Sequence, residues 1–196
     1  MDNGVGHRQQ GYPGSRQPHS PTYRVSTIML AIYPLSPATL GSAIDLTKRV
    51  FDRPGFWWEQ PGFVLWLSLR RNFVARSIFR LLGMGEARYW VVADETGLVL
   101  GVTGLYTYLN DPDACWLGWT CVDPEARSRR IGSQLVDFAI AQSQSTGRSY
   151  LRLYTWDGEE AAVARHLYQR RGFQLTRTEK LESYSLLYYE LPVQQG

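Results

Sequence analysis

The sequence contains little cysteine and little histidine, which narrows the kinds of site that it can build. Its 196 residues include 2 cysteines and 3 histidines. Cys115 and Cys121 lie on one predicted strand, so we expect two reduced, buried thiols rather than a disulfide, and a cytoplasmic location. His7 and His19 fall in a polar N-terminal stretch, where they reflect composition rather than metal binding. We therefore expect no metal site.

Long apolar runs are also missing. The sequence has no stretch of 18 apolar residues, and its N-terminus lacks the apolar core of a signal peptide, so we expect no membrane association. Met1–Thr22 is rich in Gly, Gln, Ser, Pro and His, with almost no aliphatic side chains. Such a segment cannot bury enough apolar surface to offset the entropy lost on ordering. The sequence thus predicts a disordered tail over residues 1–22 and one domain over residues 23–196.

Hydrophobic residues and aromatic rings are plentiful in the rest of the chain. The hydrophobic fraction is 44%, with 7 Trp and 12 Tyr, which is enough for a sizeable core. The net charge of +3 and the pI near 8.9 are mildly basic. This charge suits an anionic ligand. The three arginines of the stretch R-S-R-R are too few for a nucleic-acid interface, and we expect none.

The periodicity of the apolar residues predicts an α/β chain. Strands are predicted at Tyr23–Tyr33, Arg88–Ala93, Leu98–Tyr108, Cys115–Val122, Ser149–Trp156, Phe173–Leu175 and Tyr184–Leu191. Helices are predicted at Pro37–Phe51, in the second half of Phe56–Leu82, at Ile131–Ser145 and at Asp157–Gly172. The order strand, helix, strand over residues 115–156 indicates a parallel β-α-β crossover.

Local patterns add finer predictions. In the second predicted helix, Phe73, Ile78, Leu81 and Leu82 would face inward. Asp157 would cap the last helix, with Glu160 completing a capping box. Gly101 and Gly104, inside a strand, predict a bulge or a close backbone approach. The aromatic residues between Trp57 and Trp66 either shape a ligand pocket or pack in the core.

The stretch Val122–Leu135, V-D-P-E-A-R-S-R-R-I-G-S-Q-L, is the strongest functional signal. An apolar strand ends at Val122, a turn follows at Asp123-Pro124, and a helical pattern begins at Ile131. The first N–H groups of a helix lack internal partners, and the helix dipole adds roughly half a positive charge there. This arrangement predicts a site for a phosphate or a diphosphate.

This stretch resembles the acyl-CoA-binding segment of the GNAT N-acetyltransferase superfamily, whose pattern is Arg/Gln-x-x-Gly-x-Gly/Ala after a strand ending in Val-x-Pro. Arg127 takes the first position and Gly132 the last, while Arg130 replaces the middle glycine. A second family element, Asn-x-x-Ala-x-x-Leu-Tyr followed by Gly-Phe, is matched at the expected distance. Its matches are Ala164, Leu167, Tyr168, Gly172 and Phe173, with Ala161 in the place of the Asn.

The resemblance implies a single GNAT domain. Its fold would be a mixed, twisted sheet of about six to seven strands with helices on both faces, whose central parallel strands part at the acyl-CoA site. Acetyl-CoA would be the cosubstrate, with no metal, and the acceptor would be a primary amine on a small molecule or a peptide. The amine would attack directly, through a tetrahedral intermediate. Whether two copies form a homodimer stays open, and a non-catalytic acyl-CoA-binding module is the alternative.

The resemblance also implies the residues of the site. The cofactor-binding set is Cys121, Val122, Arg127, Ser128, Arg129, Arg130, Ile131, Gly132 and Ser133. Tyr168 would lie near the cofactor sulfur and donate a hydrogen bond to the leaving thiolate. The Glu that many relatives carry six residues before the Val-x-Pro valine is Trp116 in this chain. Asp111 and Asp113, in the preceding turn, are the remaining candidates for a base, and we choose Asp113.

Overall fold

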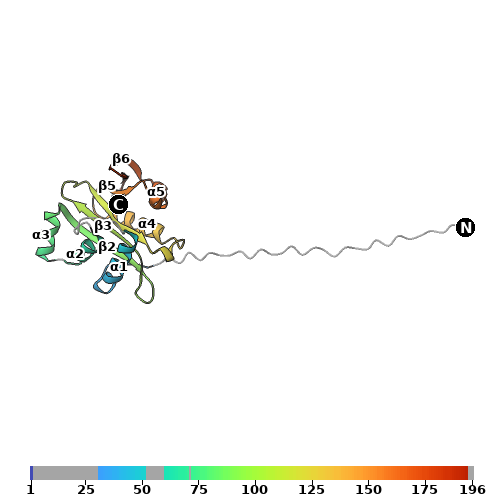
Figure 1. Cartoon of the computed structure of the whole chain (residues 1–196), viewed down its shortest axis with the longest axis horizontal. Helices are drawn as coiled ribbons and strands as arrows, with labels where there is room; N and C mark the ends of the chain where they lie inside the picture. Colours follow the sequence, from blue (N-terminus) through green and yellow to red (C-terminus); the bar gives the residue numbers. More distant parts are fainter. Residues whose placement is uncertain (2–30, 52–59, 71, 194–196) are drawn as a thin grey trace.

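The computed structural model describes Met1 and residues 31–51, 60–70 and 72–193, so the tail predicted over residues 1–22 lies almost wholly outside the described residues. The described chain forms one seven-stranded sheet flanked by helices (Figure 1). The strands are β1 (Ile32–Pro34), β2 (Met84–Ala93), β3 (Val99–Tyr108), β4 (Ala114–Val122), β5 (Tyr150–Trp156), β6 (Gln174–Lys180) and β7 (Ser185–Pro192). Their spatial order is β1-β2-β3-β4-β5-β7-β6. This mixed α/β sheet confirms the predicted fold class.

The sheet is antiparallel except where β4 lies beside β5 in the described residues. Helix α4 (Ile131–Gln144) connects these two parallel strands, which confirms the predicted crossover. The loop between β2 and β3 is a tight turn over residues 94–98. In it the Asp94 carboxylate accepts the N–H groups of Thr96 (2.9 Å) and Leu98 (3.0 Å), while Gly97 adopts a φ of 86°. Most of the first predicted strand lies outside the described residues, and its end is β1.

Three helices pack over β2, β3 and β4 on one face of the sheet: α1 (Pro37–Val50), α2 (Pro61–Ser68) and α3 (Phe73–Leu81). Helix α1 begins at a capping box between Ser36 and Thr39. The inward face predicted for the second helix is wrong at two positions. Phe73 is 82% exposed and Leu81 is 87% exposed, whereas Ala75 and Phe79 are buried. Asn72 caps α3, and the packing of the helix against β2 decides which of its faces is buried.

Helices α4 and α5 (Ala162–Gln169) pack on the opposite face, over a cluster that includes Leu151 and Leu153. The predicted capping role of Asp157 is wrong. Its carboxylate accepts the N–H of Ser185 at the start of β7 (3.0 Å), and a 3₁₀ turn precedes α5. The helix therefore begins five residues later than predicted, at Ala162. No helix among the described residues has the length and apolar character needed to cross a membrane.

The glycines of β3 and β4 make room for Tyr89 of β2, as the sequence predicted for a close approach. A Cβ on Gly104 would lie 2.3 Å from the Tyr89 ring, and one on Gly118 would lie 2.8 Å from its hydroxyl oxygen. Gly101 plays the same role on the other face, where a Cβ would lie 2.8 Å from Leu135. These three glycines allow two layers of side chains to pack tightly on the centre of the sheet.

Candidate active site

The turn after β4 is fixed by Asp123. Its N–H donates to the Leu100 carbonyl (2.9 Å), and its buried carboxylate accepts the N–H of Glu125 (3.0 Å). Arg49 of α1 donates to the same carboxylate (2.7 Å). One side chain thus ties the end of β4, the next turn and α1 together. Sequence reasoning missed Arg49, because no local pattern connects two residues 74 positions apart.

Two non-glycine residues of this turn have left-handed backbone conformations. The φ angle is 65° at Ser128 and 61° at Arg130. That conformation costs an ordinary residue about 1 kcal/mol or more, whereas glycine adopts it freely. Arg130 therefore keeps the backbone shape that a glycine at this position would provide. Left-handed residues within a turn orient successive N–H groups toward a common point, which is how main-chain anion sites are built.

The N-terminus of α4 is open to a ligand. Its N-cap is Arg130, which makes no side-chain capping bond, and its first turn contains no acidic residue. Arg127, Arg129 and Arg130 are all exposed, and none forms an ion pair within the part of the chain that the structure describes. Helix amides beside three exposed guanidinium groups are an arrangement that suits an anion, and the binding of a phosphate there stays a prediction.

The parallel strands part immediately beside this site. Their pairing ends at Trp116 and Arg152, although β4 continues to Val122 and β5 to Trp156. The register between β3 and β4 shifts over the same stretch, where β4 contains one residue more than β3. Such a bulge bends a strand away from its neighbour. The predicted separation of the central strands is therefore confirmed, and the β5-facing edge of β4 lacks a strand partner there.

Tyr168 lies on α5, on the face that α4 also covers. Its side chain is 8% exposed and its ring packs edge-on against Phe173, at 5.8 Å between ring centres. Burial, with a smaller contribution from Cys121, raises the pKa of Tyr168 to about 12. Burial also raises the pKa of the Cys121 thiol to about 12. Both groups are therefore neutral at physiological pH, and the phenol can donate a hydrogen bond.

The other face of the sheet carries a hollow of about 380 Å³ beyond α1, α2 and α3. It is lined by Trp116, Arg152, Thr176, Arg177, Tyr188, Tyr189 and Glu190. The Trp116 ring lies 6.5 Å from that of Tyr188 and 6.4 Å from that of Tyr154. Tyr106 and Tyr108 extend this row of rings onto β3.

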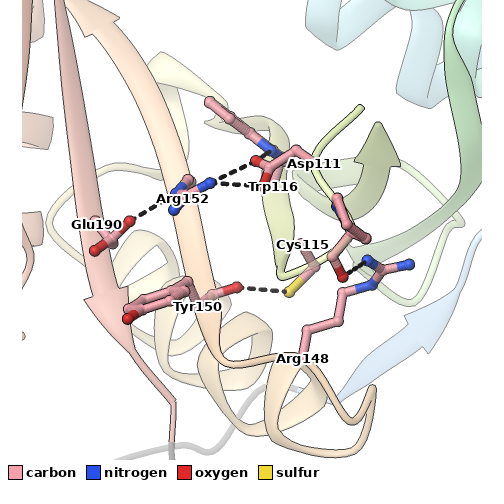
Figure 2. Close-up of polar contacts among 8 residues, drawn as sticks. Asp111, Cys115, Trp116, Arg148, Tyr150, Arg152 and Glu190 are labelled. Atoms are coloured by element: carbon pink, nitrogen blue, oxygen red, sulfur yellow. Dashed lines mark hydrogen bonds and ion pairs between the residues drawn. The ribbon is translucent and has the colours of Figure 1, made fainter. Parts of the chain in front are cut away.

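A chain of charged groups crosses the same face (Figure 2). Arg152 donates from NH1 to both oxygens of Asp111 (2.6 and 2.7 Å) and from Nε to Oε2 of Glu190 (2.6 Å). The Trp116 indole also donates to Asp111 (2.9 Å). The two carboxylates raise the pKa of Arg152 further, against the opposing effect of burial. Sequence reasoning missed Arg152 and Glu190, because their pairing depends on the register of β5 and β7.

The two candidate bases occupy different surroundings. Asp111 is held by Arg152 and Trp116. Asp113 is exposed at the start of β4, where its carbonyl accepts the N–H groups of Ser149 and Tyr150. A strand rises about 3.3 Å per residue, so Asp113 lies about 30 Å along β4 from Val122. The structure thus does not bring Asp113 together with the predicted cofactor loop, and its role as a base stays a prediction.

Comparison with known proteins connects this geometry to a family. Residues 85–175 match the acetyltransferase (GNAT) domain family. None of the curated proteins is significantly similar to the chain in sequence.

Solved structures with the same fold include three acetyltransferases. The phosphinothricin acetyltransferase of Sinorhizobium meliloti, in complex with acetyl-CoA, has a TM-score of 0.64 and 18% identity, with 85% of this chain and 90% of that one covered. The ribosomal-protein-S18-alanine N-acetyltransferase of Escherichia coli has a TM-score of 0.61 and 17% identity, with 86% and 96% covered. The spermidine/spermine N-acetyltransferase of Vibrio cholerae has a TM-score of 0.57 and 15% identity, with 83% and 94% covered.

The family match spans the strand, turn and helix that form the anion site, the parted strands and Tyr168. The solved structures cover the rest of the sheet as well. The chain therefore contains an acetyltransferase (GNAT) domain over residues 85–175, and its sheet has the fold of the solved acetyltransferases.

Proposed function

We propose that this protein transfers an acetyl group from acetyl-CoA to a primary amine on a small molecule or a peptide. One observation carries the proposal: the uncapped N-terminus of α4 follows the strand β4 at the end where β4 and β5 are no longer paired. The diphosphate would bind the N–H groups and arginines of the loop, at Arg127, Ser128, Arg129, Arg130, Ile131, Gly132 and Ser133. The pantetheine amides would pair with the free edge of β4 at Cys121 and Val122, as an added strand does.

The reaction is proposed as direct attack. The neutral amine nitrogen forms a bond to the thioester carbonyl carbon, which gives a tetrahedral intermediate. Its collapse breaks the carbon–sulfur bond and releases the sulfur as a thiolate. The nitrogen loses one proton and the sulfur gains one, so the products are an amide and a free thiol.

Tyr168 is the group proposed to interact with the leaving sulfur. With a pKa of about 12 for the phenol and about 8.5 for a thiol, complete proton transfer to the thiolate would be uphill by about 5 kcal/mol. Tyr168 therefore acts as a hydrogen-bond donor that stabilises the developing negative charge. The proton that the sulfur finally takes up comes from the attacking nitrogen.

The amine must lose a proton before it attacks. With a pKa near 10.4, only about one alkylamine molecule in two thousand is neutral at pH 7. Trp116 stands where many relatives carry a Glu, so this chain has no carboxylate at that position. We propose that water carries the proton away. Asp113 is a weaker candidate, because of its distance from the loop.

This proposal predicts the pH profile. The kcat/KM should rise about tenfold per pH unit between about pH 7 and 9.5, as the fraction of neutral amine grows. No falling limb should appear in that range, because Tyr168 keeps its proton until about pH 12. Since its folded-state pKa is raised, the stability linked to the neutral phenol is complete below about pH 10 and is lost as the pH rises through 12. A falling limb below pH 9 would contradict the buried, neutral phenol.

The activity itself is tested by release of free CoA thiol from acetyl-CoA with a panel of primary amines. Calorimetry measures acetyl-CoA binding in parallel. Binding with amine-dependent thiol release supports the proposal. Binding without turnover across the whole panel would favour a non-catalytic acyl-CoA-binding module. Failure to bind acetyl-CoA would overturn both.

The role of Tyr168 is tested by Tyr168→Phe. We expect kcat to fall at least about tenfold, because one charge-directed hydrogen bond is lost from the transition state. The acetyl-CoA Kd should stay within about twofold, since the ring is retained. Tyr89→Phe is the matched control, because Tyr89 is also a buried tyrosine, in the cluster beneath α1, α2 and α3. Unchanged kcat in Tyr168→Phe would remove this residue from the mechanism.

A further inference from the structure

We propose that the hollow on the open face of β4, β5 and β7 binds the acceptor, and that it selects an amine whose ammonium group is joined by a short alkyl chain to a flat aromatic ring. This inference rests on the proposed acetyl transfer and names the acceptor class for that reaction.

The hollow lies where the parted strands meet. Trp116 and Arg152 are the last residue pair of β4 and β5 before pairing ends, and both line the hollow. A thioester arm that enters beside Val122 and follows the free edge of β4 runs toward this pair. Leu151 and Leu153 point to the α4 and α5 side, so Arg152 between them points to the opposite face. An acceptor in the hollow would therefore approach the thioester from the face opposite Tyr168.

The walls of the hollow favour an aromatic guest. The rings of Trp116, Tyr154 and Tyr188 lie within 5.8–6.5 Å of one another, across three strands. Tyr154 is 46% exposed, so part of this aromatic surface is open to a ligand. The volume of about 380 Å³ falls in the range of small-molecule sites. A flat ring can stack on such a surface, whereas a short alkyl chain buries less of it.

The charges of the hollow favour a cation. Two arginines and one glutamate line the hollow: Arg152, Arg177 and Glu190. Two further carboxylates beside it neutralise the arginines, because Asp111 pairs with Arg152 and Glu179 with Arg177. The five groups together carry one net negative charge, which belongs to Glu190. Asp111 uses both of its oxygens in bonds, whereas the bond of Glu190 to Arg152 uses only Oε2. Oε1 of Glu190 can therefore accept a hydrogen bond from an ammonium group of the acceptor.

The aromatic rings of this face also accept cations. The Arg177 guanidinium lies 3.7 Å from the centre of the Tyr188 ring, which is a close cation–π contact. Trp116, the strongest type of ring for this interaction, lies beside it. An ammonium group held by Glu190 would thus be stabilised by a carboxylate and an aromatic face together.

The first test uses the unmodified protein. We compare KM for 2-phenylethylamine and n-butylamine, which have similar amine chemistry, with acetyl-CoA saturating. We expect KM for the aromatic amine to be at least about tenfold lower, because a phenyl ring buries more apolar surface against the aromatic walls than a short alkyl chain does. Equal KM values for the two amines would overturn the inference.

The second test changes the walls. In Trp116→Leu the KM ratio of the two amines should fall to about threefold or less, since the stacking surface is lost. Tyr33→Leu is the matched control, because Tyr33 is an exposed tyrosine on β1, at the far edge of the sheet. A ratio that is unchanged in Trp116→Leu, with the acetyl-CoA Kd preserved, would contradict a role for this ring.

The third test changes the charge. In Glu190→Gln the KM of both amines should rise at least about fivefold while kcat stays within about threefold, because an amide cannot pair with an ammonium as a carboxylate does. Glu86→Gln, at an exposed position of β2, is the control. A merely structural role would change Tm and the acetyl-CoA Kd without this KM effect.

These outcomes separate the acceptor class from the reaction. If no amine is acetylated, the proposed function fails. If alkylamines and arylalkylamines are acetylated equally well, the reaction stands and the proposed acceptor class fails.

Discussion

The two sides of the parted strands are built in different ways. On the proposed cofactor side, the loop after β4 offers main-chain N–H groups and three exposed arginines without ion pairs in the described chain. On the proposed acceptor side, Asp111 and Glu190 are both bonded to Arg152, next to a row of aromatic rings. The first side depends on backbone shape and the second on particular side chains.

This difference suggests how each side tolerates change. A main-chain site survives most side-chain substitutions, because the N–H groups stay in place as long as the turn keeps its shape. A network of paired charges is sensitive to the loss of one member, because the partners are left unpaired. We therefore expect large effects on the acceptor side and graded effects on the cofactor side.

The largest effect is expected from Arg152→Met. This substitution leaves the carboxylates of Asp111 and Glu190 without their common partner, and Arg152 is only 29% exposed. We expect the free energy of unfolding to fall by about 2–3 kcal/mol, measured by urea denaturation, with most amine acetylation lost. Arg88→Met, which breaks an exposed pair with Glu86, is the control and should cost less than about 0.5 kcal/mol. Equal losses of unfolding free energy in the two variants would show that the network stabilises the fold no more than an exposed ion pair does.

A smaller effect is expected from replacing Arg127 and Arg129 together by Gln. The acetyl-CoA Kd should rise about tenfold or somewhat more at low salt, because charge-assisted contacts are lost while the main-chain amides remain. The difference from the unmodified protein should shrink as salt is added, since exposed charges are screened. Replacing Arg76 and Arg80 of α3 by Gln provides a control of equal charge. An equal rise in Kd in that control would mean that the net charge of the protein, and not the position of Arg127 and Arg129, sets the affinity for acetyl-CoA.

Arg130→Gly separates the backbone from the side chain at one position. Glycine removes the strain of a left-handed arginine, which favours the folded state by about 1 kcal/mol. Glycine also raises the conformational entropy of the unfolded chain, which favours the unfolded state. We expect Tm to stay level or rise slightly and the acetyl-CoA Kd to change less than about threefold. A Kd that rises as much as in the double Gln variant would assign Arg130 a direct phosphate contact.

The smallest effect is expected from Asp113→Asn. Because the side chain is exposed at the paired end of β4, far along the strand from the cofactor loop, kcat should change less than about twofold. The measurement is the full pH profile with one amine acceptor. A loss of about tenfold or more, with a shifted rising limb, would establish Asp113 as the base after all.

Local sequence patterns anticipated the elements well where the relevant interactions are local. The bounds of α1 and α4 and the turn between β2 and β3 follow from caps, glycines and apolar periodicity. The failures have a common cause. Asp157 and the face of α3 were interpreted from neighbours along the chain, whereas strands distant in sequence decided their roles, β7 for Asp157 and β2 for α3.

The sequence by itself determined the family, the parallel crossover and the loop that can hold a diphosphate, because strand, turn and helix N-terminus are consecutive along the chain. The tertiary structure alone decided what lies across the gap. Asp111, Arg152 and Glu190 meet only because β4, β5 and β7 are aligned in one register. Such registers arise from the packing of the whole sheet, so no single stretch of sequence encodes them.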